Sequence, residues 1–120
     1  MKVALCQINP TVGSISDNVR KIIDVYKDAL GNNCDIIVFP ELAITGYPPQ
    51  DLLLIDKFIE ANSLALNKIV KQVTVPAIIG YVRQQKGNLY NTAALACNGK
   101  IVHEFDKIIK TKSICLLYTA

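Results

Sequence analysis

The alternation of short apolar runs with segments of helical period is the feature that most constrains this chain. Val3 to Ile8 and Ile36 to Phe39 are apolar runs rich in β-forming residues, and their length suits buried strands. Apolar residues at helical spacing predict a helix from about Asp17 to Leu30, which Ser16 is expected to cap. A second helix is expected from about Asp51 to Gln72. Successive β-α units predict parallel strands, because a helical crossover returns the chain in the same direction.

The second half of the chain carries hairpin signals in place of further helical patterns. Strands are expected over Val75 to Val82, Leu89 to Cys97 and Ile101 to Phe105. Asn98 and Gly99, between the last two strands, form the strongest short hairpin signal in the sequence. The resulting order, β-α-β-α-β-β-β, predicts an α/β fold in which parallel pairing comes first and antiparallel pairing last.

Composition bounds the size, the partners and the location of such a fold. The 120 residues suffice for one domain, and a content of 51% hydrophobic and 19% charged residues is typical of a packed globular chain. Lysines and acids are interspersed and the net charge is only +3, so nothing indicates a nucleic-acid partner. No apolar stretch approaches the length of a membrane span, and the N-terminus does not resemble a signal peptide. We therefore expect no membrane partner and a cytoplasmic location.

The cysteines and the single histidine do not suggest a metal site. Cys6, Cys34, Cys97 and Cys115 include no pair at the C-x-x-C spacing of zinc sites. Cys6 and Cys97 lie in apolar runs and are expected to be small buried side chains. His103 is expected to be a surface or structural residue. The glycine patterns of nucleotide-binding loops are also absent from the sequence.

Three side chains are candidates for chemistry, and each has a plain structural alternative. Glu41 follows an expected strand and Pro40, at the carboxyl edge where α/β sheets usually hold their sites. It could act as a general base or be a solvated loop residue. Lys107 follows the last expected strand and could stabilise an oxyanion or simply be solvated. Tyr47, in a Gly-Tyr-Pro-Pro loop, could present its hydroxyl group to a ligand or hold the loop in place.

Four segments carry a resemblance to a known family. Val38-Phe39-Pro40-Glu41-Leu42 is similar to the glutamate motif of the nitrilase, or carbon–nitrogen hydrolase, superfamily. The loop from Gly46 to Leu54, with residues 4–13 and 87–95, resembles the glutaminase domain of glutamine-dependent NAD synthetases. The resemblance covers residues 1–107 and implies the first half of an α-β-β-α nitrilase-like sandwich. Residues 108–120 are expected to be a divergent tail.

The resemblance implies a Glu-Lys-Cys site that hydrolyses the side-chain amide of glutamine. Glu41 would take the thiol proton, Lys107 would stabilise the tetrahedral intermediate, and Tyr47 would lie beside the substrate. The cysteine thiolate would form a thioester, release ammonia and be freed by water. The family's glutaminase domain needs no cofactor, whereas ATP and Mg²⁺ act in a separate synthetase domain that uses the ammonia for NAD synthesis.

The end of the sequence departs from the family pattern. Ser113 stands where the family has a tyrosine that contacts glutamine, and Cys115 follows the lysine too closely to be the nucleophile. We therefore expect a truncated domain, inactive alone, that needs a complementing subunit or forms a homo-oligomer. Two alternatives are an amidase of another nitrilase branch and a non-catalytic fragment that binds a partner subunit.

Overall fold

The computed structural model describes residues 1–109 of the chain. Its strands are β1 (Val3–Leu5), β2 (Ile36–Val38), β3 (Ala77–Gln85), β4 (Asn88–Cys97) and β5 (Lys100–Ile109). Its helices are α1 (Ile15–Leu30), the 3₁₀ helix η1 (Gln50–Leu54) and α2 (Asp56–Val70). The predicted tail, 108–120, lies outside the described residues apart from the end of β5. In the described part, no helix is long and apolar enough to cross a membrane.

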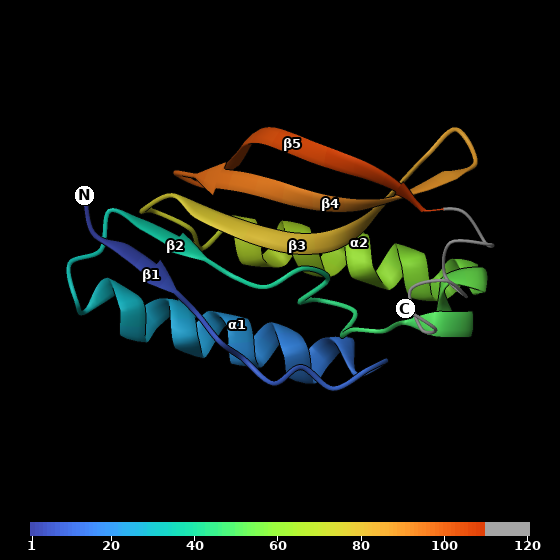
Figure 1. The fold of residues 1–120 in the computed structure, drawn as a ribbon, viewed down its shortest axis with the longest axis horizontal. Helices are drawn as coiled ribbons and strands as arrows, with labels where there is room; N and C mark the ends of the chain where they lie inside the picture. Colours follow the sequence, from blue (N-terminus) through green and yellow to red (C-terminus); the bar gives the residue numbers. More distant parts are fainter. Residues whose placement is uncertain (110–120) are drawn as a thin grey trace.

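The strands form one mixed sheet whose order along the sheet follows their order along the chain. The β1–β2 and β2–β3 pairs are parallel, whereas the β3–β4 and β4–β5 pairs are antiparallel. Helices α1 and α2 lie on the same side of this sheet (Figure 1). The predicted α/β fold and its switch from parallel to antiparallel pairing are confirmed, and both follow from the two β-α units and the terminal hairpins.

Both hairpins of the sheet have turns of the kind that the sequence signals. Asn98 and Gly99 have φ values of 51° and 77°, and Lys86 and Gly87 have φ values of 51° and 78°. Two positive φ values are characteristic of the type I′ turn, whose twist matches that of the flanking strands. The turn between β3 and β4 is therefore Lys86-Gly87, and the turn between β4 and β5 is Asn98-Gly99.

Two expectations about the helices are wrong. The expected helix from Asp51 to Gln72 is divided into η1 and α2, because Ile55 between them is extended, with φ −101° and ψ 111°. The cap residue of α1 is Ser14 in place of Ser16, and the helix begins at Ile15. The Ser14 hydroxyl donates a hydrogen bond of 2.8 Å to Asp17, so it binds a side chain of the first turn in place of a backbone amide.

The first and last strands also differ from their expected extents. β1 ends at Leu5 instead of Ile8, and it is only half buried, since Val3 and Leu5 are 47% and 77% exposed. Their side chains point away from the helices, as the period of two along a strand requires. β5 continues to Ile109, so Lys107 lies inside this strand and not after it.

The main core lies between the helices and one face of the sheet. Its fully buried members come from α1, β2, the loop after β2, β3 and β4, and they include Ile22, Ile37 and Ile79. Asn18 and Asn62 are also fully buried. Asn62 holds the edge of β3 beyond the end of β2, by accepting from the Val82 amide at 3.1 Å and donating to its carbonyl. These buried amide groups are hydrogen-bonded, as burial demands.

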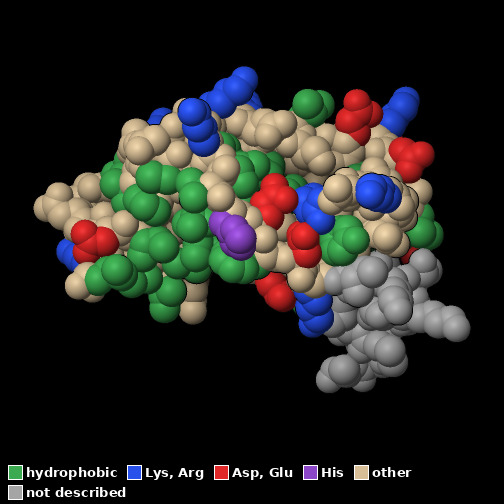
Figure 2. Space-filling view, turned by 90° about the horizontal axis from the view of Figure 1, so that it is seen from above, with side chains coloured by type: hydrophobic (Ala, Val, Ile, Leu, Met, Phe, Trp, Pro, Cys, Tyr) green, Lys and Arg blue, Asp and Glu red, His purple; other side chains and the backbone are tan. Residues whose placement is uncertain are grey.

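The opposite face of the sheet is not covered by the described residues. Leu5, Val3 and Phe105 expose about half or more of their surface there, and hydrophobic side chains gather beside His103, the single histidine (Figure 2). His103 is exposed and packs against Phe105, with ring centroids 4.5 Å apart. This agrees with its interpretation as a surface residue.

We predict that the isolated chain associates in solution, because the described residues leave an apolar sheet face uncovered and the outer edge of β5 unpaired. Sedimentation velocity across a range of concentrations should show oligomers or aggregates whose share grows with concentration. A monomer with a sharp, reversible two-state melt would show that this surface is tolerated in water.

Candidate active site

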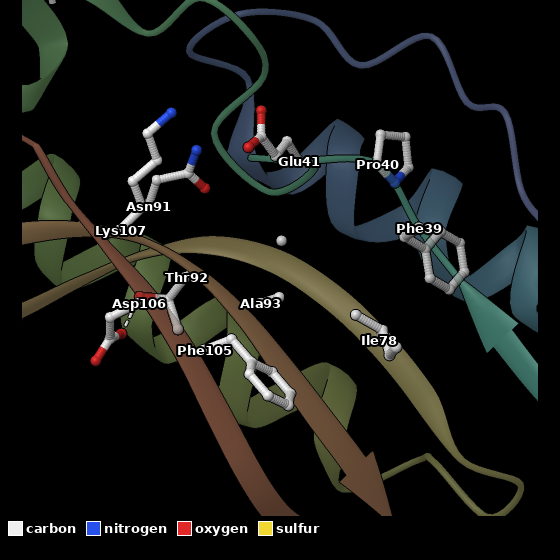
Figure 3. A pocket seen from close by; sticks show the side chains of 11 residues that line it. Phe39, Pro40, Glu41, Ile78, Asn91, Thr92, Ala93, Phe105, Asp106 and Lys107 are labelled. Carbon is white, nitrogen blue, oxygen red and sulfur yellow. Dashed lines mark hydrogen bonds between the residues drawn. The ribbon is translucent and has the colours of Figure 1, made fainter. Parts of the chain in front are cut away.

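A cavity of about 300 Å³ lies on the sheet face that the helices leave uncovered. Residues from the end of β2 and from β3, β4 and β5 line it: Phe39, Pro40, Glu41, Ile78, Gly80, Asn91, Thr92, Ala93, Phe105, Asp106 and Lys107. The side chains of Glu41, Asn91 and Lys107 lie together at one end of the cavity, and the Phe105 ring lies at the other (Figure 3). The polar end is suited to charge chemistry and the other end to apolar contact.

The backbone around Glu41 is fixed by bonds to β3. The Phe39 amide donates to the Ile78 carbonyl at 2.9 Å, and the Ile44 amide donates to the Gly80 carbonyl at 3.3 Å. Between these two anchors Leu42 has a φ of 49°, a left-handed conformation that is uncommon for leucine. The side chain of Leu42 is only 2% exposed, so packing holds this turn and presents Glu41 at the mouth of the cavity.

Gly80 permits the close approach of the segment that carries Glu41. A Cβ atom at this position would lie 2.5 Å from the Pro40 carbonyl oxygen and 2.5 Å from the Leu42 amide nitrogen. Both contacts are far shorter than atoms tolerate, and both are with backbone, which cannot rotate away. The absence of a side chain at Gly80 therefore determines how closely Glu41 lies over the sheet.

Lys107 reaches the cavity through the pairing of β5 with β4. It lies directly opposite Asn91, and side chains of directly opposed residues share one face of an antiparallel pair. Because β5 is antiparallel to β4, and β4 to β3, the carboxyl ends of β2, β3 and β5 point the same way. That shared direction brings Lys107 to the edge of the sheet where Glu41 follows β2.

The structure thus places two of the predicted site residues in one cavity. Glu41 and Lys107 are both exposed, and within residues 1–109 the ion pairs link other residues: Arg20 with Asp17, and Arg83 with Glu104 and Asp106. An open carboxylate and an open ammonium group beside the same cavity are free to act on a bound molecule. Their catalytic roles remain predictions.

Tyr47 lies outside the lining of this cavity. Its side chain is 44% exposed in the loop between β2 and η1. The neighbouring Gly46, with φ 81°, packs so closely on Val12 that a Cβ atom there would lie 2.7 Å from the Val12 Cα atom. The loop is therefore held down by Gly46, and the proposed contact of Tyr47 with a substrate remains a prediction.

The described cysteines do not reach the cavity. Cys6, Cys34 and Cys97 are partly buried, and none lines it. Burial raises the pKa of the Cys6 thiol, and the nearby Cys34 adds to that effect, so a thiolate is disfavoured there. Cys34 precedes β2, at the end opposite Glu41. Cys115 lies outside the described residues. Over those residues there is also no group of three or more His, Cys, Asp or Glu side chains that could hold a metal ion.

Sequence reasoning did not find Asn91 or Gly80. Asn91 has no motif of its own, and its place in the cavity depends on its register opposite Lys107. Asn91 lies in the expected strand from Leu89 to Cys97 and in the 87–95 segment of the family resemblance, but neither of these singles out its side chain. Gly80 matters through a tertiary contact with residues 40–42, which no local pattern reveals.

Comparison with known proteins gives a consistent result over most of the chain. Residues 2–112 match the model of the carbon-nitrogen hydrolase family. The glutamine-dependent NAD(+) synthetase of Acinetobacter baylyi is 32% identical over 107 residues, which are 88% of this chain and 20% of that protein. The enzyme of the same name from Thermotoga maritima is 34% identical over 111 residues, 90% of this chain and 19% of that protein. The chain thus spans about a fifth of the length of these relatives.

Solved structures with the same fold include synthetases and amidases. The glutamine-dependent NAD⁺ synthetase of Acinetobacter baumannii, in complex with ADP, superposes with a TM-score of 0.84 at 34% identity, over 88% of this chain and 20% of that one. An amidase from Nesterenkonia sp., with a covalent adduct at its active-site cysteine, superposes with a TM-score of 0.80 at 19% identity. That match covers 95% of this chain and 47% of the amidase, and it supports the fold alone.

Proposed function

This chain belongs to the carbon-nitrogen hydrolase family, and we propose that its cavity is the Glu–Lys part of a site that hydrolyses the side-chain amide of glutamine. The observation that carries the proposal is that Glu41 and Lys107, far apart in the sequence, line one cavity on the uncovered sheet face. The relatives that share about a third of its residues are named as glutamine-dependent synthetases, which supports glutamine as the substrate.

The proposed chemistry divides the work between a base and a cation. Glu41 would remove the proton of a cysteine thiol, and the thiolate would attack the amide carbon of glutamine. The ammonium group of Lys107 would face the negative oxygen of the tetrahedral intermediate, where a preorganised positive charge lowers the barrier most. Glu41 would then return the proton to the leaving nitrogen, so that ammonia departs and a thioester remains for water to hydrolyse.

The proposed role of the ammonia follows from the names of the relatives. In a cytoplasmic synthetase it would be the nitrogen source for NAD synthesis. That later step would use ATP and Mg²⁺ in a separate synthetase domain, and no step proposed for this cavity requires either of them. The residues described here offer oxygen, nitrogen and apolar contacts suited to an amide substrate.

We predict that the 120-residue chain releases no ammonia from glutamine above background. A thioester needs a thiolate within reach of both the base and the oxyanion donors, and Cys6, Cys34 and Cys97 all lie away from the cavity. The assay is ammonia release by purified chain, compared with a Glu41→Ala variant. Release that the variant abolishes would mean that a cysteine of this chain, with Cys115 the first to test, serves as the nucleophile.

The positive test of the proposed function supplies the nucleophile from a relative. Residues 1–109 of this chain would replace the matching segment of the Acinetobacter baylyi synthetase, which the chain resembles over 107 residues. Ammonia release from glutamine by this chimera, and its dependence on Glu41, would test the site directly.

A further inference from the structure

A charged cluster joins β3, β4 and β5 close to Lys107 but on the other face of β5. The Arg83 guanidinium group binds the Asp106 carboxylate with two bonds, from Nε to Oδ1 at 3.0 Å and from Nη2 to Oδ2 at 2.6 Å. Their side chains have 19% and 29% of their surface exposed. Paired bonds of this kind fix orientation as well as distance. Arg83 reaches Asp106 across β4, so it links two strands that are not neighbours in the sheet.

The cluster also includes Thr92, Tyr81 and Glu104. The Thr92 hydroxyl, on β4, donates to Asp106 Oδ1 at 2.6 Å (Figure 3). Glu104 accepts from the Tyr81 hydroxyl at 3.1 Å and lies 3.4 Å from Arg83 Nε. The hydrogen bond from Arg83 is the main reason why the pKa of Asp106 is lowered, and burial of the hydroxyl is the main reason why the pKa of Tyr81 is raised. Asp106 is therefore a bound carboxylate at neutral pH.

The register of β5 depends on contacts of this kind. Within the described sheet β5 pairs only with β4, and the pairing is irregular between Leu95 and Ala96. The hairpin turn lies on the far side of that irregularity from Lys107, so the turn alone does not fix the end of the strand. A slip of one residue would move the Lys107 side chain to the helix-facing side of the sheet and the Asp106 side chain to the uncovered face.

We propose that Arg83 is a positioning residue for Lys107, because its paired bonds to Asp106 hold that side chain on the helix-facing side of β5 and so keep Lys107 in the cavity. The two neighbours leave opposite sides of β5 (Figure 3), as adjacent strand residues must. The inference rests on the proposed function in one respect only, which is that Lys107 is the side chain that must lie in the cavity. Arg83 itself does not line the cavity.

The test measures how often Lys107 meets Glu41, without any need for hydrolysis. A carbodiimide joins a carboxylate and an amine in contact, with no added atoms, and mass spectrometry of the 120-residue chain quantifies the Glu41–Lys107 product. Mixing isotope-labelled with unlabelled chain separates products within one chain from those between chains. The reference product in the same sample is the one that joins Asp17 to Lys21, which lies close enough to affect the Asp17 carboxylate and is remote from β5.

We expect Arg83→Met to lower the Glu41–Lys107 product about fivefold relative to the reference, and Arg83→Lys to lower it by about half as much, since lysine keeps the charge but not the paired geometry. Asp106→Asn keeps the shape of the acceptor, so it tests the same bonds if Arg83→Met does not fold. The matched control is Lys2→Met, which removes a hydrogen bond of 2.6 Å to the Asn32 carbonyl, away from both Asp17 and β5, and should leave the product unchanged.

Two results would overturn the inference. One is an unchanged Glu41–Lys107 product in folded Arg83→Met and Asp106→Asn chains. The other is no such product in the unmodified chain, because Lys107 would then not be held beside Glu41 at all. Neither result depends on whether glutamine is the substrate, so a failure of this inference is distinct from a failure of the proposed function.

Discussion

Replacing Gly80 with alanine is expected to lower the thermal midpoint of the chain by about 10 °C, because overpacking a tight site typically costs about 2 kcal/mol in a domain of this size. The added methyl group would lie 2.5 Å from backbone atoms on both sides of Glu41. The clash can be relieved only by moving residues 40–42 off the sheet. The variant therefore couples a loss of stability to a displacement of the candidate base.

The matched control for this substitution is Gly31→Ala. Gly31 follows α1 with a φ of −65°, and a Cβ atom there would have only an ordinary contact of 3.4 Å with the Asp28 carbonyl oxygen. The Gly31→Ala variant should melt within a few degrees of the unmodified chain, or slightly higher, because alanine lowers the conformational entropy of the unfolded state. Circular dichroism at one fixed protein concentration compares the two variants. Equal midpoints would mean that the 40–42 segment moves freely and that Gly80 does not place Glu41.

The parts of the fold that were predictable are those specified by local pattern. The apolar runs at the start of β1 and over β2 give strands, and Asn98-Gly99 gives the last turn, because each depends on residues that are close in the sequence. The break at Ile55 carries no such signal. The segment on both sides of it is apolar at helical spacing, and yet the extended Ile55 divides η1 from α2.

The sequence could predict only those site residues that strand direction and the family motif are enough to locate. Glu41 follows β2 and Lys107 lies within β5, and the β-α units and hairpins determine the directions of both strands. The roles of Asn91 and Arg83 depend on the pairing register of the strands. That register places Asn91 opposite Lys107 and lets Arg83 reach Asp106 across β4. Register depends on side-chain contacts between strands, and these are not visible in the order of residues. The same limit applies to Gly80, whose role is a contact with a distant loop.

The second large effect is expected from Glu41 in the chimera that carries residues 1–109 of this chain. Glu41→Gln should lower ammonia release from glutamine by about 100-fold or more, because an amide cannot take the thiol proton and general-base catalysis typically contributes at least that factor. Glu60→Gln, at an exposed position on α2, is the matched control and should leave the rate unchanged. Lys107→Met should also lower the rate, whereas Lys100→Met, at the other end of β5, should not.

Ammonia release by the folded chimera is thus the most direct measurement of the central claim, that Glu41 and Lys107 form part of a glutamine-hydrolysing site. The account predicts release from glutamine that falls to background with Glu41→Gln and with Lys107→Met but persists with Glu60→Gln and Lys100→Met. It would be contradicted by a folded chimera whose release of ammonia is the same in all of these variants.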